Sequence, residues 1–378
     1  PEPDRTSLKN IQAQFKNDFD LNLEFTGAPL ALSDNDGYLA YNLKQSNIVG
    51  AGYFYFDHFN KKIIPKYNPF KITDNSGLLH LHKATGVLGN TAQIENSLEF
   101  TGFINSKQDE DGIIRKTPLL IEFQGDIFTH LSLSTFLKAN GIRQAQVLKD
   151  QYGPYIKAGK HKIPITKDGY IQMRFKGPAK SYKFISAVDI LNNNFLQADI
   201  QNKIILIGSS AVGLNDIYHT IYDSKFPGVE IHAVIIDNIY KNQTIIEPIW
   251  RQNLIFGVCV ATGIFMAFLF FNSSGPTALF FGTLTWICIA FISSIVSYMK
   301  LLIFISPIQP GLISISLFSF FSLFRYAISR EASFLWLKKL EANKKELQEA
   351  LNNLLTTQVT YGVYWIQIPE AKLNILCG

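Results

Sequence analysis

The chain has 378 residues, with 35 Lys and Arg against 30 Asp and Glu and a net charge of +5 at pH 7. The positive charge is spread along the chain without a patch of interleaved basic and aromatic residues, which argues against a nucleic-acid partner. None of the three cysteines precedes Cys259. We therefore expect residues 1–250 to fold without disulfides, since a region of this length buries enough apolar surface.

Helical and strand patterns alternate in the first half of residues 1–250, which predicts a mixed α/β region. A strand rich in β-branched and aromatic residues is expected at 46–56, after a helix at 36–45. Gln124-Gly125 predicts a hairpin between strands at 119–123 and 126–128. A helix is expected from 131 to 140, with Gly141 at its C-terminal cap.

Further elements are predicted between residues 160 and 240. Lys167-Asp168-Gly169 separates strand patterns at 162–166 and 170–175 and indicates a second hairpin. A short helix is expected at 187–192 and a longer one at 232–240. The run Lys203-Ile-Ile-Leu-Ile-Gly208 is the clearest candidate for a central strand, because it is apolar and ends at a glycine.

Residues 253–324 carry one charged side chain, Lys300, which predicts membrane-spanning helices. Turn chemistry at 272–276 and a polar break at 298–300 divide this block into three spans, at 253–271, 277–299 and 301–324. A soluble helix would show a polar face, and these segments show none. Pro307 and Pro310 are expected to delay the start of the third helix.

Basic residues near the membrane indicate the orientation of these helices. Six follow the third span within residues 325–345: Arg325, Arg330, Lys338, Lys339, Lys344 and Lys345. The side after the third span is therefore expected to be cytoplasmic, and the region at 1–250 to be extracytoplasmic. Such a region needs an export signal. The chain starts with Pro1 and shows no signal pattern, so either a signal peptide or anchor helix was removed or the chain is an excerpt from a longer protein; we expect the loss of an upstream anchor.

Residues 326–358 predict a cytoplasmic helix, followed by an irregular tail at 359–378. Leu340, Leu347 and Leu354 recur every seven residues, as in a coiled coil. Two readings stay open: a parallel dimeric signalling helix, and a solvated helical stalk rich in Glu and Lys. The tail matches neither a phosphoacceptor-histidine motif nor a cyclase metal-binding pair.

Polar residues around the expected strand at 203–208 are the candidate ligand-binding residues: Gly208, Ser209, Asp216, His219 and His232. Glycine and serine after a strand resemble a phosphate loop, but the complete motifs are missing and a tight turn explains the glycine equally well. The two histidines lack helical spacing, so a metal site would depend on the fold, and a structural role is the alternative. We expect no bound metal or cofactor.

Two acidic turns resemble the start of a calcium loop, at 34–37 and 109–112. Neither continues to the distal ligands of an EF-hand, so turn formation is the better explanation. In the second turn, Arg115 is expected to pair with Asp109 or Asp111 and to clamp it. No Ser-His-Asp, Cys-His or paired-carboxylate arrangement can be assembled, so no catalytic residue is predicted.

Several ordered blocks resemble the CHASE2 family of extracellular sensor domains. The most characteristic is residues 103–119, with Asp-x-Asp-Gly at 109–112, then Arg115 and Pro118-Leu119. Further blocks follow in the family's order, at 175–178, 185–191, 203–211, 213–216 and 227–233, before the three apolar stretches. The resemblance covers about residues 10–325. Thr220-Ile221 departs from it, because the family has Thr-Pro there.

The resemblance implies a bacterial receptor of the cytoplasmic (inner) membrane. Its expected fold is a mixed α/β sensor ectodomain, three transmembrane α-helices and a short cytoplasmic helix. The domain would sense an unidentified small molecule or protein, and a homodimer would pass the signal to a histidine kinase or nucleotide cyclase outside this chain. The alternative is a non-signalling accessory subunit of a membrane complex.

Overall fold

The computed structural model describes residues 4–29, 33–57, 68–209, 216–272 and 276–360. The chain forms two compact units. The first unit comprises residues 1–255 and 292–306, and the second comprises 256–291 and 307–378. Each unit is described by itself below.

The largest sheets of the first unit have three and four strands. The three-stranded sheet has the order β3-β1-β4, with β1 (Val49–Tyr55) antiparallel to β3 (Gly86–Leu88) and parallel to β4 (Phe100–Phe103). The four-stranded sheet has the order β10-β9-β8-β2, with one parallel pair, β2 and β8. Its strands are β2 (Lys71–Asp74), β8 (Gln144–Lys149), β9 (Pro154–Ala158) and β10 (His161–Pro164).

Three two-stranded pairs and seven described helices complete the unit before the apolar helices. The pairs are β6 (Leu120–Phe123) with β7 (Asp126–Thr129), β5 (Lys116–Pro118) with β11 (Tyr170–Gln172), and β12 (Ile217–Tyr218) with β13 (Phe226–Pro227). The helices are α1 (Leu8–Phe19), α3 (Asn35–Gln45), α4 (Ala92–Glu95), α5 (Leu131–Ala139), α6 (Ala187–Leu191), α7 (Gln197–Ile200) and α8 (Gly228–Lys241).

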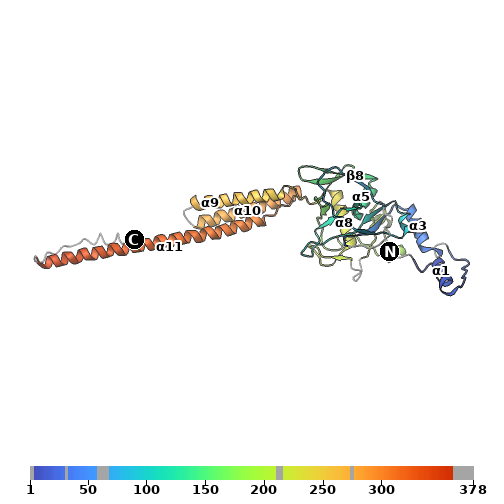
Figure 1. Cartoon of the computed structure of the whole chain (residues 1–378), viewed down its shortest axis with the longest axis horizontal. Coiled ribbons are helices and arrows are strands. Elements are labelled where there is room, and N and C mark those ends of the chain that lie inside the picture. Colours follow the sequence, from blue (N-terminus) through green and yellow to red (C-terminus); the bar gives the residue numbers. More distant parts are fainter. Residues whose placement is uncertain (1–3, 30–32, 58–67, 210–215, 273–275, 361–378) are drawn as a thin grey trace. The chain divides into compact units, whose positions relative to one another are not determined.

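The main core lies between helices α5 and α8 and the strands around them (Figure 1). Leu133 and Phe136 of α5 are fully buried, as is Ile235 of α8. The Phe136 ring makes edge contacts with Tyr240 and His161, with ring centroids 4.9 and 5.0 Å apart. A smaller aromatic cluster of Phe54, Phe103, Phe123 and Phe128 lies on β1, β4, β6 and β7.

Most elements expected in residues 1–250 are confirmed. The strand at 46–56 is β1, the first hairpin is β6–β7, and the helices at 36–45, 131–140, 187–192 and 232–240 are α3, α5, α6 and α8. Gly141 has φ +65°, the left-handed conformation expected after a helix end.

The second predicted hairpin is wrong in its pairing. The turn itself forms, because the Gly169 N–H donates to the Thr166 carbonyl at 3.0 Å and Gly169 has φ +78°. The strands that flank it belong to different sheets, since β10 pairs with β9 and β11 pairs with β5. A local turn signal cannot show this, because pairing is decided by more distant parts of the chain.

The predicted central strand at Lys203–Gly208 is also wrong. The structure shows no strand there, and the side chains of Ile205 and Ile207 are 54% and 94% exposed. The phosphate-loop interpretation required glycine and serine directly after a strand, so it loses its basis. An apolar β-branched run indicates a strand only where a neighbouring strand is in place to pair with it.

The three expected apolar helices are present as α9 (Arg251–Asn272), α10 (Pro276–Leu301) and α11 (Ile308–Thr360). Each is long and apolar enough to cross a membrane, with mean hydropathies of 2.5, 2.1 and 1.6 in the stretches concerned. The third helix begins at Ile308, later than the predicted residue 301 and between the two prolines. It continues without a break into the charged stretch, so the expected third span and the following helix are one element. Residues 361–378 of the expected irregular tail lie outside the described part of the chain.

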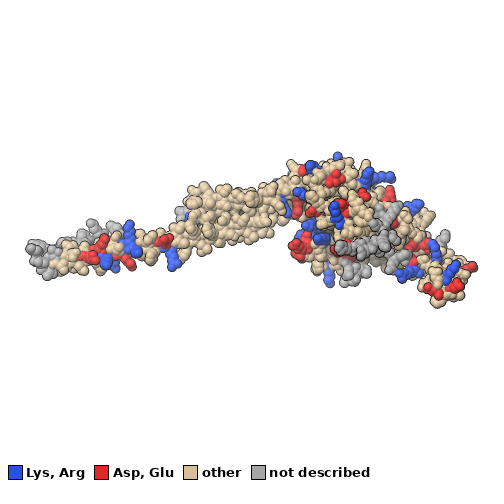
Figure 2. Space-filling view, in the orientation of Figure 1, with Lys and Arg blue, Asp and Glu red and all other residues tan. Residues whose placement is uncertain are grey.

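Within the second unit, α9 and α10 lie beside the first part of α11 (Figure 1), and polar and aromatic contacts join the three helices. The indole N–H of Trp286 on α10 donates to the Thr262 hydroxyl of α9 at 2.9 Å, and its ring stacks on Phe265. The Arg325 guanidinium on α11 donates to the Phe270 carbonyl of α9. Figure 2 shows an almost uncharged surface over these helices and charged side chains over the later part of α11. A surface of this kind suits lipid, in which charged groups are costly.

Candidate functional site

The first two turns of α8 bring together three of the predicted ligand residues. The Gly228 N–H donates to the Asp216 backbone carbonyl at 2.9 Å. Any Cβ at Gly228 would lie 1.9 Å from Asp216 Oδ1, so the Asp216 carboxylate occupies space that only glycine leaves free. Gly208 lies against Val229, and His232 is one turn further along α8. A carboxylate beside a helix N-terminus is stabilised by the helix dipole.

The remaining predicted ligand residues are positioned differently. His219 directly follows β12, and its carbonyl accepts a hydrogen bond from the Ile114 N–H at 2.8 Å, so its backbone is fixed to the turn at 109–115. Ser209 is the last described residue before the gap at 210–215, and it is not without an interaction partner. Among the described residues, no group of three or more His, Cys, Asp or Glu side chains is arranged to hold a metal ion.

Partial burial raises the pKa of the Asp216 carboxyl above its ordinary value. No hydrogen-bond donor compensates this burial among the described residues. The carboxyl group is thus less acidic than an exposed aspartate, and the helix N-terminus is the main feature that favours its charged form. The carboxylate therefore packs against the start of α8 without capping it, since the N-cap residue is Pro227 and no side-chain cap bond is made there.

A pair of histidines joins α5 to α8, and no motif or spacing indicates it. His130, the N-cap residue of α5, is buried, and its ring centroid lies 4.9 Å from that of His232. Ser132 connects them: its N–H donates to His130 Nδ1 at 3.4 Å, and its hydroxyl lies 3.0 Å from His232 Nδ1. Since His130 Nδ1 accepts, Nε2 carries the proton, and Nε2 has no hydrogen-bond partner among the described residues. The two histidines are 102 positions apart, which no spacing rule could connect.

Burial lowers the pKa of both imidazoles. The pKa of His232 falls to about 4, and that of His130 falls well below 6.5, first by burial and then by the nearby His232. The position of His130 at the start of α5 adds to this effect, because the positive end of the helix dipole disfavours a second positive charge. Both rings are therefore neutral at pH 7.

Arg115 pairs with both aspartates of the acidic turn. Its guanidinium donates to Asp109 at 3.1 Å and to both carboxylate oxygens of Asp111, at 3.0 and 2.7 Å. These bonds lower the pKa of Asp111 to about 2. The Gly112 N–H donates to the Asp109 carbonyl, so the turn closes through its backbone as well. This geometry is that of a closed turn with its carboxylates already occupied.

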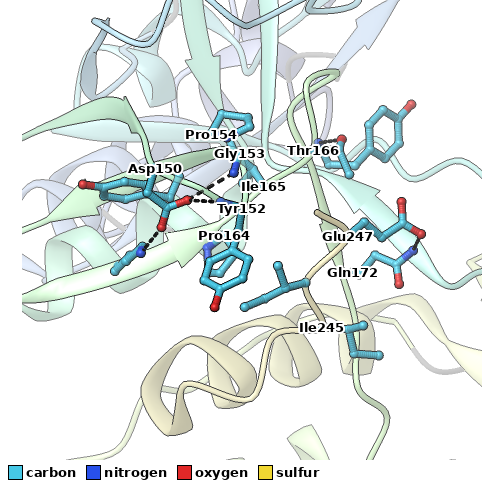
Figure 3. A pocket seen from close by; sticks show the side chains of 14 residues that line it. Asp150, Tyr152, Gly153, Pro154, Pro164, Ile165, Thr166, Gln172, Ile245 and Glu247 are labelled. Atoms are coloured by element: carbon cyan, nitrogen blue, oxygen red, sulfur yellow. Dashed lines mark hydrogen bonds and ion pairs between the residues drawn. The ribbon is translucent and has the colours of Figure 1, made fainter. Parts of the chain in front are cut away.

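A small pocket lies between the four-stranded sheet and the segment that leads into α9 (Figure 3). On one wall, the Asp150 carboxylate accepts from the Tyr152 and Gly153 N–H groups and from Lys162. On the other wall, Gln172 Nε2 donates to Glu247 at 2.6 Å. The cavity volume of about 30 Å³ is room for about two water molecules. A larger ligand would need the walls to move apart.

The pocket borders a joint formed by residues 245–249 and 302–304. The Ile245 N–H donates to the Gln172 carbonyl, and the Ile249 N–H donates to the Tyr152 carbonyl. On its other side the segment pairs with the connection between α10 and α11, through Ile246 N–H to the Leu302 carbonyl at 2.8 Å and Phe304 N–H to the Ile246 carbonyl. The sequence analysis placed no functional residue here, because the joint is made by backbone groups.

Comparison with known families assigns the fold. The model of the CHASE2 domain family matches residues 6–269. The chain belongs to the CHASE2 domain family. The matched range includes the whole α/β region and most of α9, so the CHASE2 domain and the first apolar helix are recognised together. No curated protein and no solved structure matches the chain.

The CHASE2 assignment confirms the resemblance read from the sequence blocks. The protein is a membrane protein with a sensory CHASE2 domain and three candidate membrane-spanning helices. The candidate ligand-binding residues and the clamp are not assigned a role by the family match. The Asp216 carboxylate packs against Gly228, and Arg115 closes the acidic turn.

Proposed function

We propose that this chain is the receptor part of a membrane-anchored signalling protein. Its CHASE2 domain lies outside the cytoplasm of a bacterium and senses a small molecule or protein. The three helices carry the signal through the cytoplasmic membrane to an output domain, a histidine kinase or a nucleotide cyclase, that is not part of these 378 residues. The basic residues after the third span support this orientation.

The joint at residues 245–249 is the observation that carries this proposal. It connects the CHASE2 core covalently to α9, and by hydrogen bonds to the connection between α10 and α11. A net contribution of about 0.5–1.5 kcal/mol for each backbone hydrogen bond makes the joint worth a few kcal/mol. Coupling between sites is typically about 1–3 kcal/mol, so the joint is strong enough to pass on a shift in the domain.

The continuous helix α11 supplies the last part of the route. It contains both the third apolar stretch and the charged stretch after it, so a movement of the stretch in the membrane reaches Leu347 without a hinge. The exposed leucines at the seven-residue spacing favour a parallel homodimer over a single stalk. The bilayer and the second copy are the proposed partners.

The orientation can be tested with single cysteines in a chain whose Cys259, Cys288 and Cys377 are replaced by alanine. Cysteine at Lys167, in an exposed turn of the CHASE2 domain, should react with a membrane-impermeant maleimide on intact cells. Cysteine at Lys345 should react only after the cells are permeabilised. The reverse pattern would overturn the proposed orientation.

Transmission can be tested by weakening the joint and measuring disulfide cross-linking at Leu347→Cys in membranes. Gln172→Leu keeps the side-chain size and removes the bond to Glu247. We expect the cross-linking rate to change about fivefold, because a coupling of about 1 kcal/mol corresponds to such a factor. Gln146→Leu, at an exposed position of β8, is the matched control and should leave the rate unchanged. An unchanged rate in both variants would favour the accessory-subunit alternative.

A further inference from the structure

The segment Lys203–Gly208 is an apolar strand sequence without a strand partner among the described residues. The backbone groups of residues 204–208 make no hydrogen bond to any described residue, and the segment is bonded only through the Lys203 N–H to Ile200. Its side chains are exposed as well, from 37% for Ile204 to 94% for Ile207. Sequence and structure therefore disagree most strongly here.

The exposed run leaves backbone hydrogen-bonding groups without a partner among the described residues and apolar side chains in water, and pairing with another strand would remove both costs. An unpaired extended backbone with apolar side chains is a template for the addition of another strand. Pairing would satisfy the N–H and carbonyl groups and cover the isoleucines together. Apolar side chains of the preceding helices, Val188 and Leu191 of α6 and Leu196 just before α7, are 61%, 81% and 69% exposed, so the uncovered apolar sequence is longer than the run itself.

We propose that Lys203–Gly208 is the strand through which two copies of this chain pair, antiparallel and across a two-fold axis. The charge pattern of the run favours the antiparallel direction. Its one charged side chain, Lys203, stands at one end. Antiparallel self-pairing places Lys203 near the partner's Gly208, whereas parallel pairing places the two lysines side by side, where like charges repel.

A second surface of the same chain points to the same partner. On α11, the exposed fractions of Leu340, Leu347 and Leu354 are 45%, 66% and 62%, at a spacing that a second identical helix would cover. Pairing of that helix raises the effective concentration of one CHASE2 domain at the other, so even a short strand pair would form. In a closed, two-fold dimer, the run of each chain is covered by the same run of the other chain, so neither run is left as an exposed edge. This proposal holds whether or not the domain senses a cue.

The test is disulfide cross-linking of the full-length chain in membranes, with its native cysteines replaced by alanine. Single cysteines at Ile205, Leu206 and Ile207 are compared with a cysteine at Lys167, which lies in an exposed turn. We expect a cross-linked dimer to form at least fivefold faster at one or more positions of the run than at the control. Labelling by maleimide is measured on the same samples.

Two outcomes would overturn the proposal. Fast labelling throughout the run without cross-linking would show that the segment is free in the dimer. Slow labelling without cross-linking would show that another part of the chain, or another protein, covers it. A second variant guards against misfolding: Ile207→Lys should slow cross-linking at Ile205→Cys several-fold, whereas Ile207→Val, which keeps the strand propensity, should preserve it.

Discussion

The contact between α5 and α8 differs from the contact between α9 and α10 in what holds the helices together. Eight residues of α8 are buried, four of them in the main hydrophobic core, while in α9 Thr262 and Met266 are the buried residues. The first pair stands in water and is held by removal of apolar surface. The second pair presents apolar side chains to lipid, where burial gives no such gain, and a hydrogen bond and ring stacking are left to hold it.

Helices of similar composition are therefore stabilised differently in water and in lipid. Isoleucine-rich α8 and phenylalanine-rich α9 are both apolar, yet only α8 has an amphipathic pattern that shows which face is buried. Substitutions in the two pairs should therefore differ in size by several-fold. The following predictions test that difference.

The largest effect is expected from Phe136→Ala in α5. Phe136 is fully buried against Tyr240 and His161, so its removal leaves a cavity in addition to the lost transfer free energy. We expect the free energy of unfolding of the CHASE2 domain to fall by about 3–5 kcal/mol. Pulse proteolysis of the full-length chain in lipid nanodiscs at increasing urea concentration measures it. Phe136→Leu, which retains most of the volume, should cost clearly less, and equal costs would show that the site collapses around the cavity.

The part of this core that could be predicted from the sequence is the part with a local signal. Gly141 after an apolar helix pattern, and Gln124-Gly125 between two strand patterns, each place an element because the signal and the structure are neighbours in the chain. The pairing of β11 with β5 joins residues more than 50 positions apart and left no local trace. The pair of His130 and His232 could not be predicted for the same reason, because these two residues are also far apart in the chain.

The candidate site could be predicted only in part, for a related reason. Asp216 and His232 are polar residues near an expected strand, and both lie at the first two turns of α8, but Asp216 is placed there by packing against Gly228 and not by that strand. The joint at 245–249 was missed because its bonds are made by backbone groups, which every residue possesses. Composition and motifs report on side chains, so a site made of backbone contacts is visible only in the fold.

An intermediate effect is expected from acidification, and it should be confined to the contact of α5 with α8. The folded-state pKa of His232 is about 4 and that of His130 is also lowered, against about 6.5 in the unfolded chain. Below pH 6.5 the unfolded state therefore binds more protons, and stability falls as the pH drops from about 6.5 toward 4. Each histidine contributes a slope of up to about 1.4 kcal/mol per pH unit in that range. Besides each other, the two rings contact Ser132 and the Phe103 ring, and no carboxylate interacts with them among the described residues.

The same proteolysis measurement at pH 7.5, 6 and 5 tests this slope. The double variant His130→Asn, His232→Gln retains a hydrogen-bonding group at each position but does not titrate, so its stability should vary less with pH. His80→Asn, at an exposed position, is the matched control and should keep the slope of the unmodified chain. If the double variant lost stability on acidification as steeply as the unmodified chain, the pH dependence would belong to other groups.

The smallest effect is expected from Thr262→Val in α9. Thr262 accepts the Trp286 indole N–H at 2.9 Å, and valine has nearly the same shape without the acceptor. Hydrogen bonds between membrane helices contribute about 0.6 kcal/mol on average and at most about 1.7 kcal/mol, so the loss should lie in that range. Thr285→Val is the matched control, because the bond that the Thr285 hydroxyl makes among the described residues goes to the Phe281 carbonyl of its own helix.

A double-mutant cycle of Thr262→Val with Trp286→Phe isolates the pair itself, measured by reversible unfolding of the full-length chain in bicelles. A coupling energy of about 0.6 kcal/mol would agree with a bilayer in which the unfolded helices also find polar partners. A coupling energy near that of Phe136→Ala would show instead that α9 and α10 meet in a wet, protein-like environment. The contrast between the two helix pairs would then reflect their sequences and not their solvents.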